Sequence, residues 1–101
     1  MAPVRIVPAS VAGRWSLREG RGFWEGELDL TQRFQRIGGT LTIRGKTQPL
    51  LGAYVEGEHV GFTFVDPDGG VRSVRATIDG RVLSGTARFS GDLNPITGRR
   101  R

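Results

Sequence analysis

Residues 26–34, Gly-Glu-Leu-Asp-Leu-Thr-Gln-Arg-Phe, alternate between two kinds of side chain and decide the fold class of this chain. One parity carries the larger apolar side chains and a single amide: Leu28, Leu30, Gln32 and Phe34. The other parity carries polar and charged side chains: Glu27, Asp29, Thr31 and Arg33. A period of two is typical of a β-strand with one buried face and one solvated face. The stretch therefore predicts a strand whose inward face includes Gln32 and Phe34.

The same alternation recurs along the chain between glycine-rich turns, with no helical stretch between the strands. It predicts about seven short strands, at residues 11–17, 23–34, 37–43, 50–55, 60–64, 74–78 and 83–89. Because every strand has one apolar face, the sheet must fold over itself, and closure also removes exposed edges. We expect an all-β fold, an antiparallel up-and-down meander of about seven or eight strands closed into a small barrel, with a flattened β-sandwich as the alternative. The expected domain spans residues 10–91, between an extended leader at 1–9 and an Arg-rich tail or closing segment at 92–101.

Length and composition limit the kind of protein this is. A chain of 101 residues forms one domain with a modest core. The absence of cysteine excludes a disulfide framework, a thiolate nucleophile and a cysteine metal site. The N-terminus has no long apolar run of the kind found in signal peptides, and no segment approaches the length of a membrane span. We expect a cytoplasmic protein that does not contact a membrane.

The net charge of +5 is concentrated at one end of the chain. Arg99, Arg100 and Arg101 supply three of the charges and leave 12 basic residues against 10 acidic ones. Over the strands the two signs are interspersed, which is typical of an ordinary solvated surface. The tail could bind acidic partners or be a disordered terminus. Weak nucleic-acid binding through it is a second alternative function, although Trp24 and Tyr54 are the sole candidates for stacking on bases.

Trp15 lies in the motif Gly13-x-Trp15 at the start of the first predicted strand. In calycin-type barrels, the lipocalins and their relatives, a similar motif closes one end of the barrel, and a cation often packs over the indole. Arg88 is the candidate for that cation here. The alternative is an ordinary core tryptophan. Both interpretations give Trp15 a structural role.

Gln32 is expected to point inward, where a buried amide must find hydrogen-bond partners. It could anchor a small ligand inside the barrel, or it could bond to backbone or water near a barrel mouth. Trp15, Gln32 and Tyr54 are the candidate ligand-binding residues. A filled core is favoured over a cavity because bulky side chains abound on the inward parity: Leu28, Leu30, Phe34, Leu41, Ile43, Val60, Phe62, Phe64, Ile78 and Leu83.

The sequence contains no convincing catalytic constellation. His59 is the single histidine and follows a hairpin turn, and without a partner His or Cys it makes a metal site improbable. It could act as a general base with Glu56, Glu58 or Asp66, but an exposed turn histidine is favoured. The acidic residues at 25–29 lie along a strand, where those on the outer face are expected to be solvated. We therefore predict no catalytic residue, no metal and no cofactor.

Phe23 and Trp24 form the most interesting surface candidate. Adjacent residues of a strand send their side chains to opposite faces, so at least one of these aromatics should lie outward or at a rim. Flanked by Arg21 and Glu25, an exposed aromatic could mark a protein interface. The alternative is that the pair caps one end of the barrel.

A set of short motifs gives the chain a resemblance to a known domain. They are Val7-Pro8-Ala9, Val11-Ala12-Gly13-Arg14-Trp15, Leu28-x-Leu30-x-Gln32-x-Phe34, Gly39-x-Leu41, Val60-x-Phe62-x-Phe64 and Ile78-Asp79-Gly80-Arg81-Val82-Leu83-Ser84-Gly85-Thr86. Together they resemble the small β-barrel that follows the catalytic domain in some proteobacterial class I S-adenosylmethionine-dependent methyltransferases. The resemblance covers most of residues 7–89. It implies an accessory domain, cut from a longer enzyme or encoded alone, and it carries over no catalytic residue because no cofactor-binding loop is present.

These observations order the functional hypotheses. A non-catalytic β-barrel accessory or interaction module is predicted, with a methyltransferase catalytic domain or a second copy of the chain as its partner. A calycin-like barrel that binds a small apolar ligand is the alternative. An enzyme acting alone ranks last.

Overall fold

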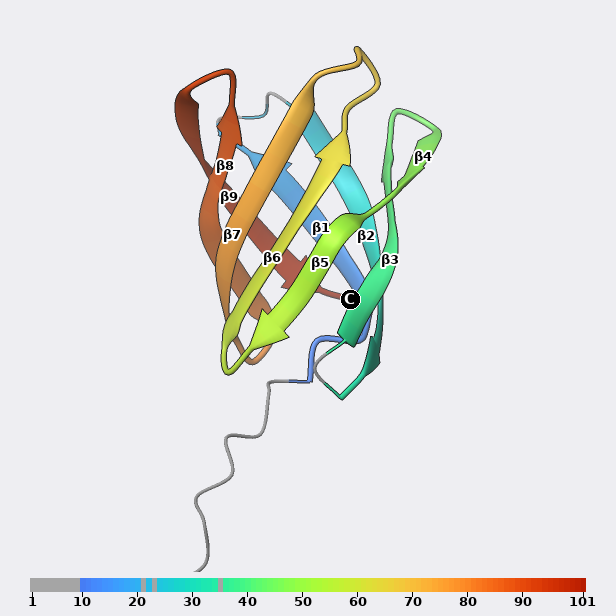
Figure 1. Cartoon of the computed structure of the whole chain (residues 1–101), viewed down its shortest axis with the longest axis vertical. Helices are drawn as coiled ribbons and strands as arrows, with labels where there is room; N and C mark the ends of the chain where they lie inside the picture. Colours follow the sequence, from blue (N-terminus) through green and yellow to red (C-terminus); the bar gives the residue numbers. More distant parts are fainter. Residues whose placement is uncertain (1–9, 21, 23, 35) are drawn as a thin grey trace, which may run out of the picture.

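The computed structural model describes residues 10–20, 22, 24–34 and 36–101. Within these residues the chain is built from antiparallel strands joined by turns (Figure 1). The strands are β1 (Gly13–Glu19), β2 (Trp24–Arg33), β3 (Arg36–Ile43), β4 (Lys46–Pro49), β5 (Leu51–Glu56), β6 (His59–Val65), β7 (Val71–Asp79), β8 (Val82–Phe89) and β9 (Asp92–Arg100).

The sheet closes on itself because β1 pairs with β2 on one side and with β9 on the other. The ring runs β1, β2, β3, β5, β6, β7, β8 and β9, and each strand is antiparallel to its neighbours. The short β4 pairs with β3 outside this ring and splays away from the barrel wall (Figure 1). The predicted all-β up-and-down barrel is therefore confirmed, and the described strands form a closed barrel rather than a flattened sandwich.

The C-terminal segment is the closing strand, so the prediction of a loose tail is wrong and its alternative holds. β9 pairs with β8 from Asp92 to Arg99 and with β1 from Ile96 to Arg100. Its inward parity holds Asn94, Ile96, Gly98 and Arg100, of which Ile96 alone is a large apolar residue. The alternation was too weakly apolar there to reveal a strand.

The β2–β3 hairpin corrects a second prediction. Phe34 is not an inward core residue, because β2 ends at Arg33 and the chain is already in a turn at Phe34, with Arg36 pairing back to Arg33. Phe34 therefore lies at the hairpin tip and is 85% exposed. The strand β4 also escaped prediction, since its residues Lys46–Pro49 are almost entirely polar.

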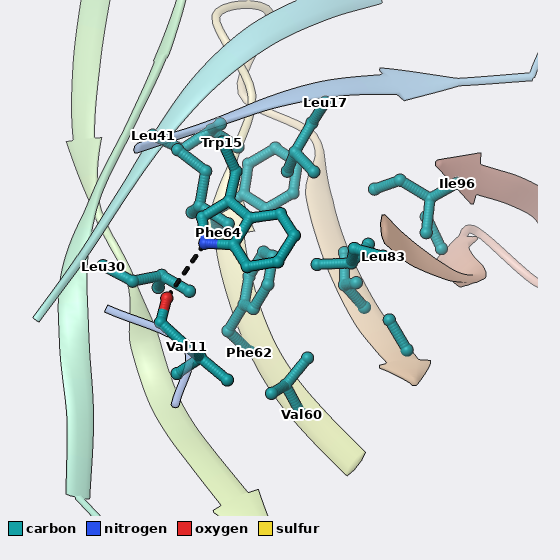
Figure 2. Packing of buried hydrophobic residues seen from close by; sticks show 14 of the residues in the cluster. Val11, Trp15, Leu17, Leu30, Leu41, Val60, Phe62, Phe64, Leu83 and Ile96 are labelled. Atoms are coloured by element: carbon teal, nitrogen blue, oxygen red, sulfur yellow. Dashed lines mark hydrogen bonds between the residues drawn. The ribbon is translucent and has the colours of Figure 1, made fainter. Parts of the chain in front are cut away.

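The interior of the barrel is a packed apolar core. The other predicted core residues are buried, and the rings of Trp15, Phe62 and Phe64 lie across the lumen (Figure 2). Phe64 and Phe62 pack at 6.2 Å between ring centroids. Tight curvature needs a glycine in β3, where Gly39 has a φ of 139° and a Cβ would overlap the Asp29 carbonyl oxygen.

Candidate functional site

The β2–β3 hairpin marks the lower end of the barrel (Figure 1). Trp15 belongs to this end, because its indole bonds to Val11, which in turn bonds to Gln32 beside the hairpin. Its indole is fully buried, and Nε1 donates a hydrogen bond of 2.9 Å to the Val11 carbonyl (Figure 2). The guanidinium of Arg100 lies 4.7 Å from the ring centroid, and its Nη2 donates to the Ser10 carbonyl. The expected cation over the indole is therefore present, but it is Arg100 and not Arg88, which is exposed on β8. The error arose because β9, and not β8, is the neighbour of β1.

Gln32 holds the two segments that meet at this end. Its Oε1 accepts a hydrogen bond of 2.7 Å from the Val11 backbone N–H. Its Nε2 donates one of 2.9 Å to the Phe34 carbonyl. The amide thus ties the N-terminal segment to the hairpin tip, as the backbone-bonded alternative predicted. The amide supports the closure of the barrel mouth, and Gln32 also lines an open surface depression of about 310 Å³ at the hairpin.

The hairpin tip itself carries an unusual residue. Phe34 has a φ of 58°, in the left-handed region that β-hairpin turns usually fill with Asn or Gly. A bulky side chain there costs about 1–2 kcal/mol of backbone strain. Sequence reasoning missed this site because Phe34 continues the apolar parity of β2. No sequence signal marks the end of that alternation.

The candidate ligand-binding residues do not converge. Trp15 is buried inside the barrel, Gln32 lies at its lower mouth, and Tyr54 is exposed on the outer face of β5. The Tyr54 ring covers Gly61, where any Cβ would overlap it. Tyr54 lines an open surface depression of about 430 Å³ together with His59. The His59 ring is exposed, as expected for a turn histidine, and its Nδ1 lies 3.4 Å from the Thr77 hydroxyl.

The upper end, the end of the β6–β7 loop, is closed by a buried ionic cluster that the sequence did not predict. Arg72 of β7 donates through Nη1 to Glu19 Oε2 and through Nε to Asp66 Oδ2, the latter at 2.9 Å. The Arg72 side chain is 13% exposed, that of Glu19 is fully buried, and that of Asp66 is 8% exposed. The guanidinium also stacks 4.3 Å from the centroid of Phe89. Glu19 is the last residue of β1 and faces inward, whereas the sequence placed it in a turn.

The β6–β7 loop is organised around Asp66. Its Oδ1 accepts hydrogen bonds from the backbone N–H groups of Asp68 and Gly70 at 2.9 and 2.8 Å. Burial by itself raises the pKa of this carboxyl, but the bonds from Arg72 and from these two N–H groups outweigh burial and lower the pKa. The ionised Asp66 carboxylate is therefore stabilised at neutral pH, and it accepts hydrogen bonds both from the loop backbone and from Arg72 of the cluster.

Trp24 belongs to the same end of the barrel. Its side chain is 7% exposed and meets Phe64 edge-on, with 5.5 Å between the centroids and an interplanar angle of 76°. It is therefore unavailable as an exposed interface aromatic, and the end-capping alternative describes it. Trp24 Nε1 and Glu19 Oε1, on paired residues of β2 and β1, are buried without a hydrogen-bond partner in the described part of the chain. Phe23 lies outside the described residues.

The outer face over β1 carries a depression of about 780 Å³, which we call the β1–β9 groove. Six of its fourteen lining residues are charged: Arg18, Arg44, Arg99, Arg101, Glu25 and Glu27. Arg101 spans it, donating to Ser16 Oγ at 2.9 Å and lying 3.4 Å from Glu27 Oε1. Residues 99–101 are therefore ordered along the barrel wall and do not form a disordered terminus.

Comparisons with protein-family models and with curated proteins find no match for this chain. Among the described residues no cluster of three or more His, Asp or Glu side chains is placed to hold a metal ion. In the same part of the chain no helix is long and apolar enough to cross a membrane.

Proposed function

We propose that this chain is a non-catalytic accessory module that acts by contact with a partner protein, as its resemblance to the C-terminal barrel of class I methyltransferases implies. One observation carries the proposal: the barrel is filled along its length and closed at both ends. Trp15 and the Gln32 bonds close the lower end, while the Arg72 cluster closes the upper one. Because the interior offers no room, recognition must occur on the outer surface.

The filled interior also weighs against the calycin-like alternative. An eight-stranded barrel holds a ligand only when its inward side chains leave space for one. Here the lumen is occupied by large buried groups, including Trp15, Phe62 and Phe64 (Figure 2). Three depressions formed by the described residues are open to the surface, and exposed side chains of the barrel wall line each of them beside a few buried ones.

Phe34 is the side chain best suited to anchor a partner. Phe34 is 85% exposed at a hairpin tip. Its strained backbone is held by a hydrogen bond that Gln32 Nε2 donates to the Phe34 carbonyl. Strained residues are retained where function requires them, and aromatic anchors dominate protein interfaces. Arg33 and Arg36, paired across the hairpin, flank it and would form a polar rim.

Titration calorimetry against a class I methyltransferase catalytic domain from the same genome tests the proposal, with sedimentation velocity of the chain alone to detect a homo-oligomer. Binding by the wild type, weakened about tenfold or more in Phe34→Asn, is expected. Leu93→Asn is the matched control, because it removes another exposed apolar side chain at the opposite end of the barrel. A strict monomer without affinity for any such domain would refute the function.

A further inference from the structure

Two arginines of the β1–β9 groove, Arg18 and Arg99, form no salt bridge with the described residues, although Arg18 lies opposite Glu25 of β2. Arg18 lies opposite Thr97 and Arg99 opposite Ser16, so the two are diagonal neighbours on adjacent strands, with Cβ atoms about 7 Å apart. Both are exposed, and within the described part of the chain neither side chain has an ion pair or hydrogen bond. Two like charges at this distance repel each other. An anion placed between them relieves that repulsion.

The other cations of the groove are already paired. Arg44 lies 3.2 Å from Asp68, and Arg101 is held by Glu27. The lining has four arginines against two glutamates, with Glu25 opposite Arg18 on β2, so positive charges remain in excess. Thr97 lies opposite Arg18 and Ser16 opposite Arg99 in the strand register, and both hydroxyl-bearing residues line the groove.

We propose that the β1–β9 groove binds an extended acidic segment of a partner protein, with carboxylates at alternate positions paired to Arg18 and Arg99. In an extended chain side chains two residues apart share a face and lie about 6.7 Å apart. This spacing matches the diagonal separation of the two arginines. The inference rests on the proposed accessory function and names a surface and a ligand class for it.

The groove suits a peptide better than a nucleic acid. A nucleic-acid backbone would bring phosphates beside Glu25 and Glu27, which line the same depression. A peptide can place a carboxylate opposite each arginine and turn backbone N–H groups or uncharged side chains toward these glutamates. Single-strand binding surfaces also stack bases on aromatic rings, and the groove lining has none.

The test uses the whole chain and a fluorescein-labelled peptide, Ser-Glu-Ser-Glu-Ser-Glu-Ser, followed by anisotropy at low salt. The double variant Arg18→Gln/Arg99→Gln is expected to weaken Kd by roughly tenfold. The control Arg75→Gln/Arg88→Gln removes the same charge from two exposed positions outside the groove and should change Kd less than about twofold. The isomer Glu-Glu-Ser-Ser-Glu-Ser-Ser has the same composition but no two carboxylates two residues apart, and it should bind more weakly than the alternating peptide.

Four results would overturn the inference. The first is the absence of saturable peptide binding, and the second is an equal loss of affinity in the two double variants. The third is equal affinity for the alternating peptide and its isomer. The fourth is that a single-stranded oligothymidylate of equal charge binds more tightly than the peptide and loses this binding in Arg18→Gln/Arg99→Gln. Failure here is distinguishable from failure of the proposed function. If the catalytic domain binds wild type and Arg18→Gln/Arg99→Gln alike while the peptide does not bind, the accessory function stands without the groove. If the peptide binds through these arginines but no catalytic domain does, the groove stands without that partner.

Discussion

Replacing Arg72 with methionine should be among the most destabilising single changes on the barrel. The arginine is the cation of a cluster in which Glu19 is fully buried and Asp66 nearly so. Methionine keeps much of the side-chain volume against Phe89 but leaves two buried carboxylates without a counter-charge. Breaking a buried ion pair from one side costs about 3–5 kcal/mol. A domain of this size is stable by about 5–15 kcal/mol in total, so the loss is a large fraction.

Urea-induced unfolding followed by the fluorescence of the buried tryptophans measures this loss. At pH 7 the free energy of unfolding of Arg72→Met should fall by about 3–5 kcal/mol, with a lower melting temperature. Arg75→Met is the matched control, because Arg75 lies on the same strand with an exposed side chain. Surface changes of this kind stay within about 0.5 kcal/mol.

The pH dependence of the difference identifies its cause. In the wild type, folding lowers the pKa of Asp66 below its ordinary value of 3.8. The contribution of Asp66 to stability is therefore fully present above pH 3.8 and is lost as the pH falls through the pKa of the folded state. Without Arg72 fewer hydrogen bonds oppose the effect of burial, so the pKa of Asp66 rises. Protonation of Asp66 then removes its buried, unpaired charge and restores part of the stability of Arg72→Met. The stability gap between wild type and variant should therefore narrow as pH falls from about 7 to about 4.

A triple variant separates lost charge compensation from lost packing. Glu19→Gln/Asp66→Asn/Arg72→Met removes all three charges and should recover at least about half of the stability lost in Arg72→Met, because neutral groups of similar volume often replace buried ion pairs without loss. The reasoning is refuted if Arg72→Met matches Arg75→Met at pH 7, or if its deficit does not change with pH.

Three further predictions concern single positions, each checked by urea unfolding. The free energy of unfolding of Gly39→Ala should fall by about 2–3 kcal/mol, because φ is positive there and a Cβ would overlap the Asp29 carbonyl oxygen. That of Gly38→Ala, where a Cβ makes ordinary contacts, should fall by less than about 1 kcal/mol, and equal losses would contradict the close approach of Gly39 to Asp29. Phe34→Asn should gain about 1 kcal/mol by relieving left-handed strain, and a loss of stability would show that the exposed ring packs in solution. Gln32→Met should lower the free energy of unfolding by about 1–2 kcal/mol, because it removes two hydrogen bonds to the backbone. Gln32→Glu keeps the oxygen that accepts from the Val11 N–H and should lower it less; the reverse order would argue that this oxygen is not the acceptor.

The wall of the barrel could be predicted because period-two alternation is a local property. It is strong wherever the inward parity is apolar, as in β2, β6 and β8. It fails in β9, whose inward face holds Asn94, Gly98 and Arg100 around a single isoleucine. It also cannot mark where a strand ends, so Phe34 was placed in the core although the chain had already turned.

The ends of the barrel could not be predicted because they are made by contacts between distant segments. Glu19 and Arg72 are separated by 53 positions, and each looked like a solvated charge in its own neighbourhood. Arg100 reaches Trp15 only because β9 pairs with β1, a closure that no local pattern encodes. Charged residues on an inward parity, such as Glu19 two positions after Leu17, were the available signal. A buried charge requires a partner, and that requirement could have prompted a search for one.

The parity of the strands also separates stability from recognition. Inward residues fill the lumen or close its ends, so changing them, as at Arg72 or Gln32, acts on the free energy of unfolding. Outward residues such as Arg18 and Arg99 make no side-chain hydrogen bond or salt bridge with the described residues, so changing them should leave stability within about 0.5 kcal/mol of wild type. A loss of partner binding in such variants therefore cannot be attributed to unfolding. For a closed and filled barrel, the outward parity is where function is to be sought, and there it can be tested without disturbing the fold.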